Sequence, residues 1–233
     1  MANKKMIAAI HQPNFLPWLG YFYKMLKSDY FVFLDDVQYI RRGYTSRVKI
    51  KTPQGEKWLT VPVKKKGRYH QLVSEVELEP DNKWKNKISG TLQSCCGKAP
   101  HFKSYFPGFE KIIQKDHRLL AGLNIELIKW LARAFGIDIP MVKSSQLPGV
   151  TGQASERLVT ICKALGATQY LSGFGGQNYQ EKEVFEREGI QLLVYDFQHP
   201  EYPQLFGDFT PGLSAVDLLF NCGPQSAEIL REI

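Results

Sequence analysis

The sequence predicts an α/β fold built on a parallel sheet of about five strands, and three observations lead to this prediction. Residues 5–36 have the pattern of a buried strand, a helix and a second buried strand, which is typical of a parallel βαβ unit. The alternation of strands and helices returns after residue 139. Residues 46–136 interrupt it with a hairpin pattern followed by helical patterns. We therefore expect a single α/β domain over residues 1–233, with a Rossmann-like, doubly wound sheet and residues 46–136 as an insertion.

The first βαβ unit is predicted from local apolar patterns. Residues 5–11 form a short apolar strand, and Pro17 can open a helix because the first turn does not need its missing N–H. Residues 18–27 continue this helix with apolar side chains on one side. Residues 29–36 form a second apolar strand, which ends at two adjacent acids.

The predicted insertion begins with a β-hairpin. Two alternating runs within residues 46–63 flank a Thr-Pro-Gln-Gly turn. A basic loop follows, and residues 72–80 suggest another short strand. Helical patterns then cover residues 83–96, 102–114 and 117–135.

The remaining strands and helices follow the insertion. Strands are predicted over residues 140–145, 168–173 and 190–197. A helix with Thr151 as its cap is predicted to end at Gly166, and another is predicted over residues 179–188. The last helix is predicted to begin at the cap Ser214, with Asp217 in its first turn, and to stop at Gly223-Pro224.

Composition narrows the class of protein. Hydrophobic residues make up 43% of the 233 residues, enough for a buried core, which argues against disorder. The net charge of +7 and the pI of about 9.1 favour an acidic partner, such as a nucleic acid, a nucleotide, a phosphate or an anionic membrane surface.

The cysteines and the apolar runs predict the compartment. The four cysteines form no CxxC pair and no zinc spacing, so we expect reduced thiols and no metal site built from them. No run approaches the roughly 18 apolar residues of a membrane span, and the N-terminal apolar run is too short for a signal peptide. We expect a cytoplasmic protein with no membrane span.

The stretch "HQPNFLPWLG" connects the first predicted strand to the first helix. Ligands of doubly wound sheets bind outside the carboxyl ends of the strands, and a helix N-terminus favours an anion. His11 is the candidate catalytic base here, and the candidate substrate-binding residues are Gln12, Asn14 and Trp18. The alternative is that the aromatic side chains pack in the core and that His11 is a satisfied strand-end residue.

The stretch "LDDVQYIRRGYTSR" follows the second predicted strand. Asp35 and Asp36 can serve as a general base or bind Mg²⁺. Arginines can hold a phosphate or carboxylate in bidentate fashion. The candidate substrate-binding residues in this stretch are Gln38, Tyr39, Arg41, Arg42 and Arg47. The alternative is a solvated loop with local ion pairs.

The stretch "SGFGGQNY" follows a later strand. Three glycines within four residues let backbone N–H groups approach an anion, although the stretch is neither a P-loop nor a GxGxxG motif. The candidate binding residues here are Gly173, Gly175, Gly176, Asn178 and Tyr179. His199, beyond the last strand, is expected to complete the pocket rim. The alternative for the glycines is a flexible turn.

The basic loop "KKKGRYH" is the last candidate. It places Tyr69 and His70 among lysines and an arginine, and interleaved aromatic and basic residues suit RNA or nucleotide binding. A solvated run of charge is the alternative explanation.

Several of these stretches together resemble the WbqC-like family: "HQPNFLPWLGYF", "SDYFVFLDDVQY", "WLTVPV", "YLSGFGGQNY" and "LSAVDLLFNCG". The resemblance spans nearly the whole chain. It implies a place in the biosynthesis of bacterial surface polysaccharide (O-antigen) and related sugars, because members of the family are encoded with genes of that pathway.

One short segment of the chain is also similar to a motif of nucleotidyltransferases of the HIGH type. When Gly20 is set on the glycine of their G-x-F-D-x-x-H-x-G-H motif, Trp18 and Tyr21 fall where its two histidines would be. Both catalytic histidines are therefore missing. The similarity implies a nucleotidyltransferase-like arrangement of the sheet rather than adenylyl transfer through that motif.

Three functions are expected from these features. The first is an enzyme that transfers an acyl or aminoacyl group to an amino group of a nucleotide-linked sugar, with His11 as base and Asp35 or Asp36 as alternatives. Its partner would be an anionic small molecule, either the nucleotide sugar or the activated donor, or a tRNA that carries the donor. The second is a nucleotidyltransferase-like enzyme, for which Mg²⁺ or a nucleotide is the candidate cofactor. The third is an RNA-binding (tRNA-binding) module without catalysis.

Overall fold

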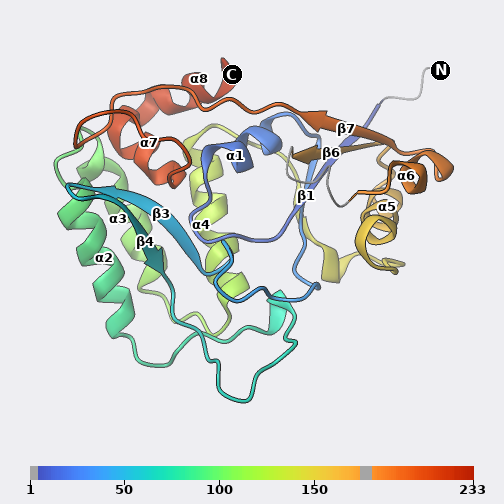
Figure 1. The fold of residues 1–233 in the computed structure, drawn as a ribbon, viewed down its shortest axis with the longest axis horizontal. Helices are drawn as coiled ribbons and strands as arrows, with labels where there is room; N and C mark the ends of the chain where they lie inside the picture. The colour runs from blue at the N-terminus through green and yellow to red at the C-terminus, as the bar shows by residue number, and fades with distance from the viewer. Residues whose placement is uncertain (1–4, 174–179) are drawn as a thin grey trace. The chain divides into compact units, whose positions relative to one another are not determined.

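A computed structural model describes residues 5–173 and 180–233 (Figure 1). The contacts between residues divide the chain into two compact units. The first unit comprises Met1–Gln12, Tyr23–Asp36 and Asp138–Gln198, and the second comprises Pro13–Phe22, Val37–Ile137 and His199–Ile233. The expected insertion, residues 46–136, lies within the second unit. That the chain is a single domain stays a prediction.

The first unit contains the parallel sheet. Its strands are β1 (Ile7–His11), β2 (Tyr30–Phe33), β5 (Met141–Lys143), β6 (Gln169–Gly173) and β7 (Gln191–Tyr195). They lie in the order β5-β2-β1-β6-β7, and each neighbouring pair is parallel, which confirms the α/β fold with a five-strand parallel sheet. The chain builds the sheet outward from β1 through β2 to β5, then returns to add β6 and β7 on the other side of β1. The order therefore reverses between β1 and β6.

Apolar side chains from the sheet and its helices form the core of the first unit. Helices α5 (Ala154–Ala164) and α6 (Lys182–Arg187) pack against each other, α5 also against β6 and α6 against β7. The Tyr170 and Phe185 rings stack with centroids 5.4 Å apart. Helix α1 (Leu19–Leu26) contributes residues to both units.

The expected cap of α5 is wrong. The N-cap residue is Gln153, and the backbone N–H and carbonyl of Thr151 instead both bond to the Thr160 hydroxyl. The physical reason is the backbone before the helix: Gly152 and Ala154 both have positive φ angles, so a regular helix cannot begin at Thr151.

The second unit contains the hairpin and a group of helices. Strands β3 (Arg47–Thr52) and β4 (Gly55–Thr60) pair antiparallel around the turn, as predicted, and Gly55 takes a φ of +100° there. The helices of this unit are α2 (Lys83–Cys96), α3 (Phe102–Ile113), α4 (Leu120–Ala134), α7 (Ala215–Cys222) and α8 (Ser226–Arg231). Helix α3 packs against α2, α4 and α7 (Figure 1). The predicted cap of α7 is confirmed, because the Ser214 hydroxyl accepts the Val216 N–H.

The strand predicted over residues 72–80 is wrong. This segment contains a 3₁₀ turn (Val73–Glu75) and isolated bridges, not a strand. Val73, Val76 and Leu78 are buried, which explains the alternating pattern, but successive backbone groups bond to different segments. The Val73 N–H donates to the Val37 carbonyl, and the Leu78 N–H to the Arg118 carbonyl, so no continuous ladder forms.

Two further features bear on the expected compartment. The four cysteines are buried and free. Among the helices within residues 5–173 and 180–233, none is long and apolar enough to cross a membrane.

Candidate functional site

His11 lies at the carboxyl end of β1, the strand beside which the sheet order reverses. Its side chain is half-buried, and Nδ1 lies 3.2 Å from the Gln12 carbonyl oxygen. Burial and the positive charge of Lys24 lower the pKa of His11 to about 3, which the bond to Gln12 opposes only in part. The imidazole is therefore neutral at physiological pH.

Lys24, on α1, is one residue of this region that sequence reasoning missed. Its side chain is 2% exposed, and Nζ donates to the Ile10 carbonyl on β1 at 2.7 Å. Nζ also lies 5.4 Å from the centre of the Tyr170 ring on β6. The amine thus sits beside the two strands between which the sheet order reverses. One charged residue within the apolar run 19–26 was the available signal.

Burial lowers the pKa of Lys24 to about 7. The nearby Cys162 does not neutralise the ammonium, because burial raises the pKa of its thiol to about 12. Above about pH 7, Lys24 therefore exists largely as an uncharged amine. A neutral imidazole and an amine that titrates near pH 7 are close enough for the charge of one to shift the pKa of the other.

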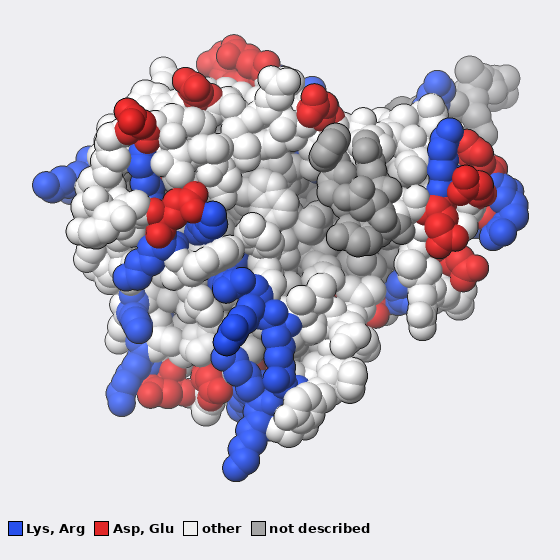
Figure 2. All heavy atoms as spheres, in the orientation of Figure 1, with Lys and Arg blue, Asp and Glu red and all other residues white. Residues whose placement is uncertain are grey.

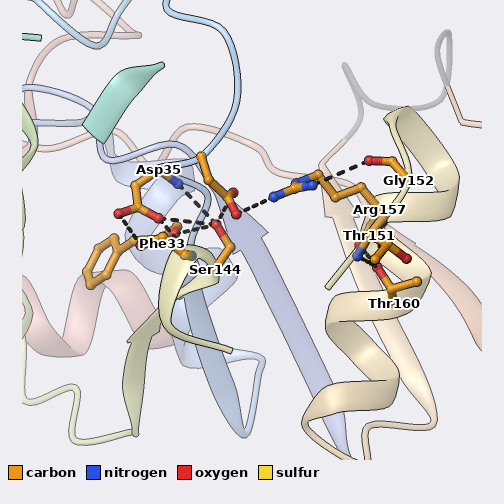
Figure 3. Close-up of polar contacts among 9 residues, drawn as sticks. Phe33, Asp35, Ser144, Thr151, Gly152, Arg157 and Thr160 are labelled. Carbon is orange, nitrogen blue, oxygen red and sulfur yellow. Dashed lines mark hydrogen bonds and ion pairs between the residues drawn. The ribbon is translucent and has the colours of Figure 1, made fainter. Parts of the chain in front are cut away.

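Asp35 and Asp36 follow β2 as predicted, and Asp35 is 2% exposed. The Asp35 carboxylate accepts the Ser145 N–H at 3.1 Å and the Ser145 hydroxyl at 2.9 Å. Its own N–H donates to the Ser144 hydroxyl at 3.2 Å. These bonds fasten the end of β2 to the segment that follows β5 (Figure 3).

Asp36 belongs to the same cluster but pairs with a helix. One carboxylate oxygen accepts the Ser144 hydroxyl at 2.5 Å, and the other forms an ion pair with Arg157 on α5. Arg157 also donates to the Gly152 carbonyl at 3.3 Å, as Figure 3 shows. Sequence reasoning missed Ser144, Ser145 and Arg157, which lie more than 100 residues from the two acids.

These partners bear on whether Asp35 and Asp36 suit Mg²⁺. All four carboxylate oxygens already accept hydrogen bonds or an ion pair from protein groups. A cation bound by both acids would have to displace Arg157 or the serine donors. Within the described residues, no group of three or more His, Cys, Asp or Glu side chains is arranged to hold a metal ion. The arrangement therefore fits a cluster of hydrogen bonds and one ion pair that ties the end of β2 to the segment after β5 and to α5. We call this cluster the polar clamp, and it fits the contacts better than a metal centre does.

We expect Arg157→Ala to lower the free energy of unfolding by about 3 kcal/mol, because it leaves the Asp36 carboxylate largely buried and without its cation. Urea denaturation measures this change. The double variant Asp36→Asn/Arg157→Met should lose less than Arg157→Ala alone. Lys163→Ala is the matched control: it breaks a more exposed pair with Glu188 on the same helix and should cost under about 1 kcal/mol. A loss from Arg157→Ala no larger than that of the control would contradict the clamp.

Asn14 and Trp18 lie in the second unit, where the turn between β1 and α1 is held by backbone bonds. The Asn124 amide donates to the Pro13 carbonyl at 2.8 Å, and the Ser214 hydroxyl donates to the Leu16 carbonyl at 2.8 Å. Asn14 is buried, and the Trp18 ring lies 5.2 Å from that of Tyr44. Residues far along the chain therefore fix the shape of this turn.

The polar residues after Asp36 also lie in the second unit. Tyr39 donates its hydroxyl to Ser46 at 2.9 Å, and the Gln38 amide lies 3.4 Å from His70 Nδ1. Arg41 donates to the Arg68 carbonyl at 2.9 Å. The Arg47 guanidinium lies 4.1 Å from the centre of the Trp58 ring, and Arg42 is exposed.

The expected site residues are thus distributed over both units. His11, Gln12, Asp35, Asp36 and Gly173 belong to the first unit, and the His11 carbonyl accepts the N–H of Leu34, the residue before Asp35. His199 belongs to the second unit, where burial lowers its pKa. Gly175, Gly176, Asn178 and Tyr179 lie outside the described residues. The first group lies at the carboxyl ends of the strands of the sheet, and the roles of its members stay predictions.

Comparisons with known proteins agree with the resemblance noted in the sequence. The model of the WbqC-like protein family matches residues 12–229. A protein of Mycobacterium tuberculosis (strain ATCC 25618 / H37Rv), named "Uncharacterized protein Rv1507c", is 34% identical over 225 residues, which cover 96% of each chain. No solved structure matches the chain.

Proposed function

Because the chain belongs to the WbqC-like protein family, we propose that it is an enzyme of bacterial surface polysaccharide (O-antigen) sugar biosynthesis. Its proposed reaction is the transfer of an acyl or aminoacyl group to an amino group of a nucleotide-linked sugar. The pathway rests on the family. The reaction rests on one observation: a neutral imidazole, His11, and a buried amine, Lys24, meet at the carboxyl end of β1.

Acyl transfer to an amine needs a group that accepts a proton. The sugar nitrogen attacks the acyl carbonyl carbon, a C–N bond forms, and the bond to the donor's leaving group breaks. The nitrogen stays positively charged until it loses a proton. Once the leaving group has departed, this N-protonated amide is strongly acidic, so even an imidazole of low pKa can take its proton. When His11 Nδ1–H donates to the Gln12 carbonyl, the lone pair that accepts this proton is on Nε2.

The strand order supports a nucleotide-linked substrate. The sheet builds outward from β1 in both directions, as in Rossmann-like and nucleotidyltransferase-like sheets, and such sheets bind nucleotides at the carboxyl ends beside the reversal. His11 and Lys24 lie at that place in this chain. Nucleotidyl transfer with Mg²⁺ on Asp35 and Asp36 is less well supported, because the oxygens of both acids are already engaged.

The test uses a UDP-linked aminodeoxy sugar as acceptor, with acetyl-coenzyme A and a glycyl thioester as donors. Mass spectrometry detects the N-acylated sugar nucleotide, and a thiol assay detects the leaving group. We expect His11→Gln to lower turnover by at least about 100-fold. His117→Gln, at a half-buried histidine of the second unit, is the matched control and should retain turnover.

Two outcomes would contradict different parts of the proposal, the first the role of His11 and the second the reaction itself. Full turnover by His11→Gln would remove His11 as the base while leaving the reaction in place. Release of pyrophosphate from a nucleoside triphosphate, with no acylated product from either donor, would replace acyl transfer by nucleotidyl transfer.

A further inference from the structure

The positive charge of the chain is concentrated in one segment of the second unit. Residues 37–72 contain ten Lys and Arg and a single acid, Glu56, a net charge of +9. The other 197 residues hold the remaining 20 Lys and Arg and the remaining 22 Asp and Glu, a net charge of −2. The basic character of the protein therefore comes entirely from this segment, and Figure 2 shows Lys and Arg side chains gathered over the lower part of the face drawn.

Few of these cations are neutralised by neighbours. Lys49 pairs with Glu56, and Lys64 and Arg68 pair with Glu77. Within the described residues, the other seven form no ion pair within 4.0 Å. Lys51 is buried and donates to the Gln204 side chain, so six remain that are at least partly exposed. They are Arg41, Arg42, Arg47, Lys57, Lys65 and Lys66. Their charges are available to an anionic partner.

Hydrogen bonds join two basic loops of the segment: the first loop contains Tyr39 and Arg41, and the second contains residues 64–71. The Tyr39 N–H donates to the Gln71 carbonyl at 2.8 Å, and Arg41 donates to the Arg68 carbonyl at 2.9 Å. Glu77 anchors the second loop through Lys64 and Arg68, and these two cations lower the pKa of Glu77 to about 2, so the anchor stays ionised. These bonds distinguish the two loops from a run of charged residues that contacts only solvent.

Exposed aromatic rings lie among the cations. Tyr69 is 72% exposed, with the Arg41 guanidinium 4.9 Å from its ring centre. Trp58 is exposed and carries Arg47 at 4.1 Å, and its ring lies 5.7 Å from that of the exposed Tyr44. Five of the seven large hydrophobic side chains that are exposed in the described chain come from residues 37–72. Cations and stacking rings thus share one surface.

A pocket adjoins Tyr69. Its volume is about 560 Å³, and it is lined by Arg68, Tyr69, Glu75, Glu77 and Arg118 together with Gly67, Gln71 and Leu119. The Arg118 guanidinium, which is 82% exposed, and the Tyr69 ring suit a phosphate and a stacked base, and the Glu75 carboxylate can accept a hydrogen bond from the amino group of a base. This combination fits a nucleotide better than a lipid tail.

We propose that this surface, formed by the unpaired cations and exposed rings of residues 37–72, binds single-stranded RNA. Single-stranded nucleic acids are bound by a positive groove along the backbone together with aromatic rings on which successive bases stack. The surface is made of a hairpin and loops and offers no helix for the groove of a duplex. It lies wholly within the second unit, so the proposal does not depend on the reaction proposed for His11.

The test is fluorescence anisotropy of the full chain with a 5′-fluorescein RNA of 20 nucleotides and mixed sequence, from 50 to 200 mM KCl. The affinity should fall with salt, with a slope of about −0.7 per phosphate neutralised. In Arg42→Ala/Lys65→Ala/Lys66→Ala we expect at least tenfold weaker binding and a slope shallower by about 2. The control Lys87→Ala/Lys103→Ala/Lys111→Ala removes the same charge from exposed positions of α2 and α3 and should bind within twofold of wild type.

A second comparison isolates stacking from charge. Tyr69→Leu should weaken binding about tenfold, whereas Tyr69→Phe should bind like wild type. Circular dichroism confirms that each variant folds. The proposal is overturned if both triple variants lose affinity equally, if RNA binding does not depend on salt, or if the chain binds phosphatidylserine vesicles and leaves the RNA free.

Discussion

Replacing Lys24 with methionine is expected to stabilise the fold and to raise the pKa of His11. The buried ammonium is unfavourable, since burial lowers the pKa of Lys24 from 10.5 to about 7. That difference corresponds to roughly 5 kcal/mol at and below neutral pH. Methionine removes this cost but leaves the Ile10 carbonyl without its donor, which costs about 1–3 kcal/mol. We therefore expect a net gain in unfolding free energy of about 2 kcal/mol at pH 6.

The pH dependence of stability tests separately whether Lys24→Met stabilises the fold. Between pH 7 and 10.5 the unfolded chain holds the Lys24 proton and the folded chain does not. The stability of the wild type therefore rises with pH across this window. The advantage of Lys24→Met should be fully present below pH 7 and should disappear as the pH approaches 10.5. Urea denaturation at pH 6, 8 and 10 measures this.

A shift in the pKa of His11 is expected from the same change, because the charge of Lys24 acts on the imidazole. Without the neighbouring positive charge, the pKa of His11 should rise from about 3, and NMR titration of its ring protons would record the rise. Lys27→Met, an exposed lysine one turn further along, is the control and should alter neither the stability of the fold nor the pKa of His11 appreciably. A destabilised Lys24→Met, or one with an unshifted His11, would contradict this role.

The sequence predicted well those strands and turns whose formation depends on residues close together in the chain. The βαβ unit over residues 5–36 and the hairpin over residues 46–63 follow from apolar periodicity and turn residues within short windows. The strand expected over residues 72–80 shows the limit of that reasoning. Its alternation reports burial, but a strand also needs one continuous partner, and that depends on the tertiary fold.

The candidate site depends on distant partners for the same reason. Asp35 and Asp36 could be identified as strand-end acids, yet their role as a clamp depends on Ser144, Ser145 and Arg157, more than 100 residues away. Lys24 acquires its low pKa only because packing buries it beside Ile10 and Tyr170. Sequence patterns identify polar residues at strand ends but do not reveal which of them are already satisfied.

The buried Asn124 offers the second large expected effect. It is fully buried on α4, and its Nδ2 donates to the Pro13 carbonyl at 2.8 Å and to the Thr45 carbonyl at 2.7 Å. Two carbonyl partners fix the orientation of the amide, because only the NH₂ group can donate to both. One side chain thus joins the turn that carries Asn14 to the loop that precedes β3.

We expect Asn124→Leu to lower the free energy of unfolding by about 3 kcal/mol, because two buried carbonyls lose their donor at about 1–3 kcal/mol each. Asn124→Asp should cost more, since it places a carboxylate against the same two oxygens. Asn86→Leu, at an exposed amide of α2 that accepts from Gln114, is the control and should change stability by about 0.5 kcal/mol or less.

Amide hydrogen exchange distinguishes a local effect of Asn124→Leu from general destabilisation. The Phe15 N–H donates to the Tyr44 carbonyl at 3.0 Å, across the same two segments that Asn124 joins. Its protection should fall more than that of the Leu78 N–H, which bonds to Arg118 elsewhere in the second unit. Equal losses at both amides, or a change in stability no larger than that of Asn86→Leu, would show that water replaces the lost donor and that the turn keeps its shape without Asn124.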